Sequence, residues 1–144
     1  MSAAELYERD YYEWTVRNAE LLRSGRVNEA DLANIAEELE DLGRRERRGL
    51  LNRLSLLITY LLKWKAQPQR QSRGWELTIR VQRKDLAKLL SENPSLRPYV
   101  KKNVPEAYER AMVEAMTETG LPESAFPSTC PFALDVLLDL DFLP

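Results

Sequence analysis

The sequence predicts an all-α fold, a bundle of about five or six mostly antiparallel helices with a short C-terminal helix packed on it. Apolar residues recur at spacings of three and four along most of the chain, which is the period of a helix face. Leu, Ala, Glu and Arg are abundant and only five residues are glycine, a composition that favours helix. A chain of 144 residues can bury one core, so we expect a single helical domain over residues 1–144.

The N-terminal part of the bundle is expected to begin with a helix over residues 4–23, which Ser24 and Gly25 end. One face of this helix is formed by Leu6, Tyr7, Tyr11, Trp14, Asn18, Leu21 and Leu22. A second helix is expected to begin near Asn28. Its apolar stripe consists of Leu32, Ile35, Ala36, Leu39 and Leu42. Gly43 interrupts this pattern, and we expect a kink there.

The central helix is expected from Leu50 to a point before Pro68, because its apolar residues are numerous enough to face neighbours on more than one side. Proline disfavours the helical conformation of the residue that precedes it, which sets the end of the helix. Ser72 is placed as the N-cap of the next helix. The buried side of that helix is expected to contain Trp75, Ile79, Gln82, Leu86, Leu89 and Leu90.

Two prolines are expected to interrupt helices in the following segment. Asn93 and Pro94 are expected to close one helix, and Ser95 resembles the N-cap of another. Pro105 is expected to break or kink the path before a helical pattern resumes over residues 107–119.

The chain ends in a segment of different character. Gly120 is expected to cap the preceding helix. Residues 121–144 contain four prolines and a last apolar stretch. Pro131 after Cys130 has the arrangement of a helix start, so we expect a short helix there.

The sequence contains no histidine, which excludes several classes of catalytic and metal site. Serine–histidine and cysteine–histidine nucleophile pairs, histidine-ligated zinc and Glu-x-x-His di-iron sites all require an imidazole. The single Cys130 has no partner for an internal disulfide. We therefore expect no cofactor, and a carboxylate-rich metal site, if one existed, would favour Mg or Mn.

The chain also lacks the features of a membrane protein. No apolar leader follows Met1, and the longest apolar run, near residues 54–62, is far shorter than the roughly 20 residues that a membrane-spanning helix needs. A cytoplasmic location without a membrane partner is the resulting expectation.

The formal net charge is only −2, but the charges are segregated along the chain. Residues 44–88 carry thirteen lysines and arginines against three acids, whereas residues 29–41 carry six acids and no base. The simplest interpretation is that acidic and basic helices neutralise each other across the bundle. The alternative is an anion- or nucleic-acid-binding face. Its candidate residues are Arg44, Arg45, Arg47, Arg48, Arg80 and Lys84.

Glu37, Glu38 and Asp41 are the residues that come closest to a metal site. Side chains three and four residues apart share one side of a helix, so this turn and a second helix could hold a divalent ion together. All-helical nucleotide pyrophosphatases combine such a turn with a later E-x-x-D motif, which this sequence lacks. A solvent-exposed acidic face, or salt bridges to arginine, is the simpler interpretation.

Residues 61–83 combine tryptophans with arginines. Trp64 lies near the end of one predicted helix and Trp75 in the first turn of the next, so we expect the two aromatic side chains to fix the bend between these helices. Arg73 and Arg83 could bind phosphate or stack on bases. A cation at the edge of a core more simply meets a carboxylate. We therefore predict that one of these arginines pairs with one of the three acids of the preceding paragraph, in a charged network.

Over nearly the whole chain, short motifs follow one another in the order that is found in a known protein family. They are Trp14 with Leu21-Leu22-Arg23-Ser24-Gly25, Asn34-Ile35-Ala36-Glu37-Glu38, Leu61-Leu62-Lys63-Trp64, Arg73-Gly74-Trp75, Thr78-Ile79, Gln82-Arg83, Pro94-Ser95-Leu96, Phe126-Pro127, Cys130-Pro131 and Phe142-Leu143-Pro144. In these the sequence resembles DUF29, a bacterial family that is especially numerous in cyanobacteria. Gly74 and Phe132 depart from the family pattern, where a serine-like residue and tyrosine are common. The resemblance implies a compact helical fold and supplies no catalytic residues.

These features favour a small helical-bundle protein that acts by binding and without catalysis, with another protein or a second copy of itself as the partner. The first alternative is an anion- or nucleic-acid-binding module that uses residues 44–88. The second is a carboxylate-metal-dependent hydrolase of nucleotides or phosphoesters, built on the acidic turn.

Overall fold

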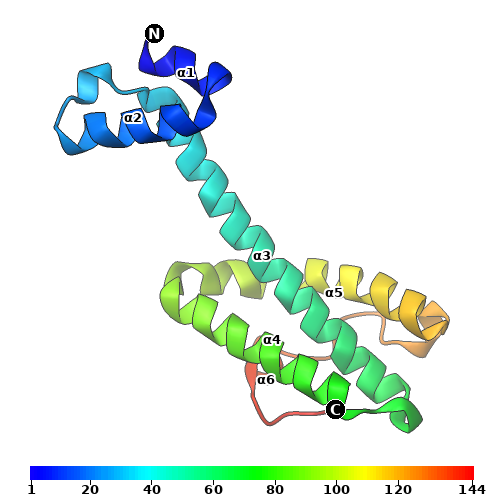
Figure 1. The fold of residues 1–144 in the computed structure, drawn as a ribbon. Helices are drawn as coiled ribbons and strands as arrows, with labels where there is room; N and C mark the ends of the chain where they lie inside the picture. The colour runs from blue at the N-terminus through cyan, green and yellow to red at the C-terminus, as the bar shows by residue number, and fades with distance from the viewer. The chain divides into compact units, whose positions relative to one another are not determined.

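The computed structural model describes all 144 residues, and its regular elements are all helical, which confirms the predicted all-α bundle (Figure 1). The six α-helices are α1 Ala3–Arg9, α2 Tyr11–Arg23, α3 Leu32–Ala66, α4 Arg73–Glu92, α5 Arg97–Thr119 and α6 Leu134–Leu138. Short 3-10 turns lie between them at Val27–Glu29, Pro68–Arg70, Pro94–Leu96 and Glu123–Ala125. No helix combines the length and the apolar character that crossing a membrane requires.

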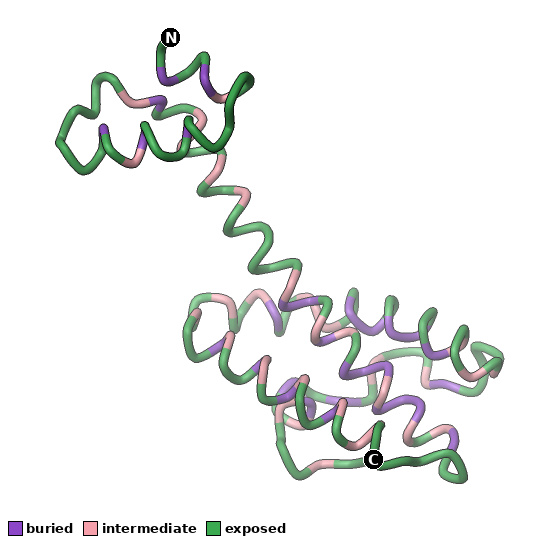
Figure 2. The backbone as a smooth tube through the Cα atoms, in the orientation of Figure 1, coloured by how far each residue is buried: buried purple, intermediate pink, exposed green.

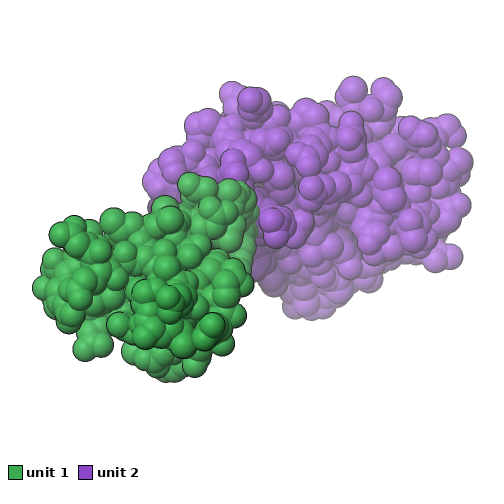
Figure 3. Space-filling view, turned by 90° about the horizontal axis from the view of Figure 1, so that it is seen from above, with its two compact units in different colours: residues 1–46 green, residues 47–144 purple.

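Internal contacts divide the chain into two compact units, Met1–Glu46 and Arg47–Pro144 (Figure 3). The first unit contains α1, α2 and residues 32–46 of α3. The second contains residues 47–66 of α3 together with α4, α5 and α6.

The hydrophobic core of the second unit is built around the later part of α3. Leu50, Leu54, Leu57 and Ile58 have no exposed surface, and they share one core cluster with residues of α4, α5 and α6. Figure 2 colours much of this part of α3 as buried. The apolar residues of this stretch are spread around the helix, so they can contact several neighbours at once. The prediction of a central helix is confirmed for this part of the chain.

Several predicted helix ends are confirmed by their capping bonds. The Oγ of Ser72 accepts a hydrogen bond from the backbone N–H of Trp75 at 3.2 Å, which fixes the start of α4. Helix α3 ends at Ala66, before Pro68. Gly120 follows α5 with a φ of 72°, a left-handed conformation that glycine adopts without steric cost.

The helix predicted over residues 4–23 is in fact two helices. Asp10 ends α1 and begins α2, because its side chain accepts the backbone N–H of Glu13 at 3.0 Å. The following helix also begins later than predicted. Its cap is Asp31, whose side chain accepts the backbone N–H of Asn34 at 3.4 Å, and Asn28 lies in a 3-10 turn.

Two expected interruptions do not divide their helices. Helix α3 is continuous through Gly43, and α5 is continuous through Pro105. A proline within a helix removes one hydrogen bond, here to the carbonyl of Lys101, and the neighbouring turns keep α5 intact. Ser95 makes no cap, because α5 follows a 3-10 turn directly, and the short C-terminal helix begins at Leu134, later than predicted.

Candidate functional site

The early part of α3 carries an apolar stripe that its own unit leaves uncovered. Leu32, Leu39 and Leu42 keep 50, 63 and 53% of their surface exposed. With Ile35 and Ala36 on the same side of the helix they form the surface that we name the α3 stripe. This part of α3 contains no buried residue (Figure 2). The stripe seen in the sequence is thus an exposed surface.

Helices α1 and α2 contact a different side of α3, the polar one. Tyr7 donates its hydroxyl to Glu38 Oε1 at 2.7 Å, and Trp14 donates its indole N–H to Asp31 Oδ2 at 2.9 Å. Asp31, Asn34 and Glu38 are spaced by three and four residues and therefore share one helix side. Because these contacts use the polar side, the α3 stripe faces outward.

A buried polar network holds this arrangement in place. Asn18 Oδ1 accepts the backbone N–H of Asp31 at 2.8 Å, and Asn18 Nδ2 donates to the carbonyl of Trp14 at 2.8 Å. Asn34 Nδ2 donates to Asp31 Oδ2 at 2.7 Å. Burial by itself would raise the pKa of Asp31, but the hydrogen bonds from Asn34 and Trp14 outweigh it and hold the pKa below its ordinary value. Sequence reasoning missed this network, although Asn18 on an otherwise apolar face was its signal.

Three aromatic rings pack together at the edge of the network. The ring centroids of Tyr7 and Trp14 are 5.0 Å apart, and Tyr11 stacks on Trp14 at 5.6 Å. The hydrogen bond from Tyr7 lowers the pKa of Glu38, and the same bond raises the pKa of Tyr7 to about 12. The cluster thus stabilises Glu38 as a carboxylate at the surface of α3.

The structure does not gather the three acids that were the weak metal candidates. Glu38 is bound by Tyr7, Asp41 pairs with Arg44 on the same helix, and Glu37 is exposed and makes no ion pair. No group of three or more acidic or thiol side chains is placed to hold a metal ion.

The predicted charged network between these acids and Arg73 or Arg83 requires correction for Arg83, whereas its form with Arg73 stays a prediction. Arg83 is 1% exposed, and its guanidinium donates to the carbonyls of Leu137 at 2.8 Å and Phe142 at 2.5 Å. Its N–H groups are therefore taken by the C-terminal segment, and burial lowers the pKa of Arg83. Arg73, the first residue of α4, makes no ion pair.

Trp75, in the first turn of α4, and Tyr60 of α3 flank a lysine that sequence reasoning overlooked. Lys63 is 8% exposed, and its Nζ lies 2.6 Å from a carboxylate oxygen of Glu118. The same Nζ lies 4.4 Å from the ring centroid of Tyr60 and 4.6 Å from that of Trp75. Trp64 is half-buried against the core. The signal for this site was a lysine between Leu62 and Trp64, in an apolar stretch of the central helix.

The candidate anion-binding residues are partly neutralised. Arg44 and Arg80 pair with glutamates four residues away on their own helices, at 3.2 and 3.6 Å. The guanidinium of Arg47 lies over the Tyr99 ring, 5.3 Å from its centroid. The other candidates make no ion pair: Arg45, Arg48 and Lys84.

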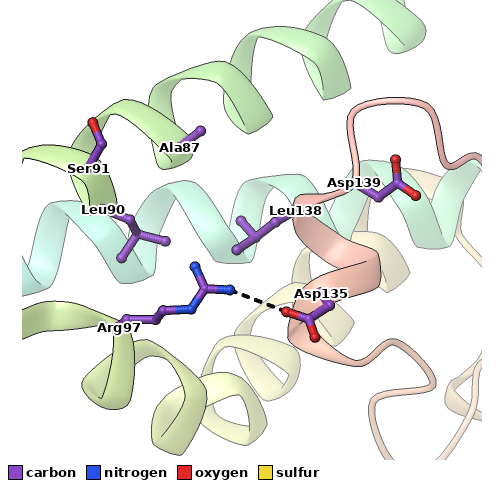
Figure 4. Close-up of a pocket in the computed structure, with 7 residues that line it drawn as sticks. All are labelled: Ala87, Leu90, Ser91, Arg97, Asp135, Leu138 and Asp139. Atoms are coloured by element: carbon purple, nitrogen blue, oxygen red, sulfur yellow. Dashed lines mark hydrogen bonds and ion pairs between the residues drawn. The ribbon is translucent and has the colours of Figure 1, made fainter. Parts of the chain in front are cut away.

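Two cavities of the second unit are alternative candidate sites. One, of about 400 Å³, is lined by α4 and α6 and crossed at its edge by the ion pair of Arg97 with Asp135 at 3.2 Å (Figure 4). The other, of about 480 Å³, is lined by Tyr108 and Cys130 among others. Burial raises the pKa of the Cys130 thiol, which makes it a poor nucleophile. Neither cavity gathers a set of groups with a recognisable catalytic geometry.

Comparison with models of known families gives a match over nearly the whole chain. A family model described as "Domain of unknown function DUF29" matches residues 6–143. No curated protein and no solved structure matches the chain.

Proposed function

The chain belongs to the DUF29 family, and we propose that it acts as a protein-interaction module that binds an amphipathic helix of its partner along the α3 stripe. The observation that carries this proposal is the exposure of Leu32, Leu39 and Leu42 on one side of a helix. Contiguous apolar surface rimmed by charges is typical of interaction sites. Burial of one leucine side chain contributes about 1.5–3 kcal/mol, so the exposed stripe represents a substantial driving force for binding.

The form of the stripe favours a helix as the bound element. Its apolar residues recur at three- and four-residue spacing, which is the pattern of a helix–helix seam. Ala36 and Gly43 border Leu39 on one side, and the methyl group of Ala36 and the missing side chain of Gly43 permit a close approach of a second backbone. We infer that a helix with its own apolar stripe is the complementary ligand.

Charged residues at the edges of the stripe would select the partner. Glu38 is held on one edge by the hydroxyl of Tyr7 at 2.7 Å. Arg45 lies two turns further along the same edge and makes no ion pair within the chain. Such flanking charges fix register and orientation more than affinity.

The alternative of anion or nucleic-acid binding is less favoured, because half of its candidate residues have partners within the chain. A salt series separates it from the main proposal. Nucleic-acid binding would weaken steeply as salt rises, since phosphate contacts release counterions. Binding through an apolar stripe would change little over the same range.

Photocrosslinking tests the proposed function. A photoreactive phenylalanine analogue at Leu39 in the full-length chain should form a crosslink to a protein in cells of the source organism. The matched control places the same residue at Glu37, which is exposed on the opposite side of α3. Crosslinks from position 39 that are absent from position 37 support the proposal. No protein adduct at position 39, or equal adducts at both positions, would overturn it.

A further inference from the structure

The larger of the two cavities lies wholly within the second unit, apart from the α3 stripe. It has a volume of about 480 Å³ and is enclosed by residues 101–109 of α5 and by residues 128–134. Cavities of this size accommodate small organic molecules. We propose that it binds a free peptide of about three to four apolar residues in extended form, with the carboxylate of the peptide at Lys101 and its ammonium at Glu109.

The walls of the cavity are mostly apolar. Tyr108 donates its hydroxyl to the carbonyl of Pro127, and the thiol of Cys130 donates to the carbonyl of Phe132 at 3.4 Å. These polar groups therefore have partners within the chain, and the walls favour a ligand with an apolar body. The side chains that supply apolar surface are Val104, Pro105, Tyr108, Phe132, Ala133 and Leu134.

Two charged residues of opposite sign lie at the two ends of the α5 wall. Lys101 and Glu109 both line the cavity, and both are exposed. Neither makes an ion pair within the chain. They are eight residues apart, which places them about 12 Å from each other along the helix axis. A ligand that carries an anion at one end and a cation at the other complements this pair.

Neighbouring charges of α5 reinforce this polarity. Residues 97–105 contain three lysines and arginines and no acid, whereas residues 106–118 contain four glutamates and a single arginine. Asp135 pairs with Arg97 at 3.2 Å, so Lys101 and Lys102 remain as the free cations at this end. The potential along the cavity therefore orients a ligand with two charged ends in one direction.

The polar groups between the two ends suit the backbone of a peptide. Pro105 has no N–H, so the carbonyl of Lys101 lacks its usual helical donor and can accept an amide N–H of the ligand. Ser128 and Thr129 add hydroxyls to the second wall, and these can donate to carbonyls of the ligand. An extended chain spans about 3.3 Å per residue, so three to four residues cover the distance from Lys101 to Glu109.

The single cysteine of the chain provides the assay. Cys130 lines the cavity, so a bound molecule should slow its alkylation by iodoacetamide. Trileucine should protect the thiol in a saturable manner. Amidation of its carboxylate, or acetylation of its ammonium, should each weaken binding by about fivefold, the range of an exposed ion pair. Methyl NMR signals of Val104 and Leu134 should shift on binding, whereas shifts confined to other residues would overturn the location.

Variants of the two charged residues test each end separately. Lys101→Met should bind trileucine and its amide equally, and Glu109→Gln should bind trileucine and its acetylated form equally. Lys102→Met and Glu114→Gln are the matched controls, because neither residue lines the cavity, and both should keep the differences seen with the wild type.

Three outcomes would overturn the proposal. Absence of protection by trileucine would exclude a peptide ligand. Equal protection by trileucine, its amide and its acetylated form would show that the cavity recognises apolar surface alone. An acetylated form that binds as tightly as trileucine, together with a weakly bound amide, would assign the cavity to the C-terminus of a longer chain.

Discussion

Trp14 donates its indole N–H to the carboxylate of Asp31 at 2.9 Å, and both side chains are buried. This bond joins α2 to the start of α3 and holds α1 and α2 on the polar side of α3. The exposed position of the α3 stripe therefore depends on it.

Removal of the Asp31 carboxylate should destabilise the first unit. In Asp31→Ala the indole of Trp14 and the amide of Asn34 lose their acceptor, and a buried polar group without a partner costs about 1–3 kcal/mol. Urea unfolding followed by the NMR signal of the Trp14 indole N–H measures this change. Asp10→Ala, which removes only the exposed cap of α2, should cost less. Equal stability of Asp31→Ala and the wild type would contradict the role given to the bond.

The first unit should lose stability in acid. Because hydrogen bonds hold the pKa of Asp31 below its ordinary value of 3.8, the stabilisation is fully present above that pH and is lost as the pH falls through the lower folded-state pKa. Unfolding of the unit, followed by the same indole signal from about pH 6 to about pH 2, should show this loss. Asp31→Asn should flatten the dependence, and an unchanged profile in that variant would assign the effect to other acids.

Arg83 should hold the C-terminal segment against α4. Arg83→Met keeps the apolar stem but leaves the carbonyls of Leu137 and Phe142 without their donor, at a cost of about 1–3 kcal/mol. Hydrogen exchange should then accelerate over residues 136–142. Arg80→Met is the control, because its surface ion pair should be worth less than about 1 kcal/mol. Similar exchange in both variants would argue against a specific role for Arg83.

Because Lys63 of α3 is buried beside Glu118, we expect stability to depend on Glu118 and very little on Glu114, although both glutamates lie on α5. Glu118→Gln removes the negative charge beside Lys63 and leaves the buried ammonium without an ion pair, so stability should fall by about 1–3 kcal/mol. Glu114→Gln, on the same helix and exposed, should change stability by less than about 0.5 kcal/mol. Thermal unfolding of the two variants provides the comparison, and the prediction is wrong if their midpoints coincide.

The expectation that residues 1–144 form a single domain stays a prediction that unfolding can test. A single cooperative domain requires the indole signal of Trp14 and an amide signal of the second core, such as that of Thr59, to disappear at the same urea concentration. Separate midpoints would show that the units Met1–Glu46 and Arg47–Pro144 unfold independently.

The part of the fold that sequence predicts well is the part set by neighbouring residues. Ser72 and Gly120 mark helix ends because a cap needs only a side chain or a left-handed backbone within a few residues. Where two local signals compete, prediction fails. Asp10 carries a cap that divides an otherwise continuous apolar face, and Pro105 remains within a helix because its neighbours hold the turns around it.

The sequence predicted the apolar residues of the candidate site but not their exposure, because exposure depends on contacts between distant segments. The stripe of Leu32, Leu39 and Leu42 was visible in the sequence, but apolar periodicity shows that a face exists and not what covers it. Arg83 illustrates the opposite error. Its position at the margin of a helix face suggested a carboxylate partner, whereas its donors meet backbone carbonyls, which carry no signature in the side-chain pattern.

The ordered motifs of the sequence by themselves determined the family. The sequence also determined the all-α class and several helix ends, because these depend on interactions within about four residues along the backbone. Only the tertiary structure decided that the α3 stripe stays exposed while the polar side of α3 receives α1 and α2. It also decided that Arg83 binds the carbonyl of Leu137, 54 residues away. Contacts of this kind depend on how remote segments pack and which of their polar groups must find partners once buried, and no local pattern encodes that choice.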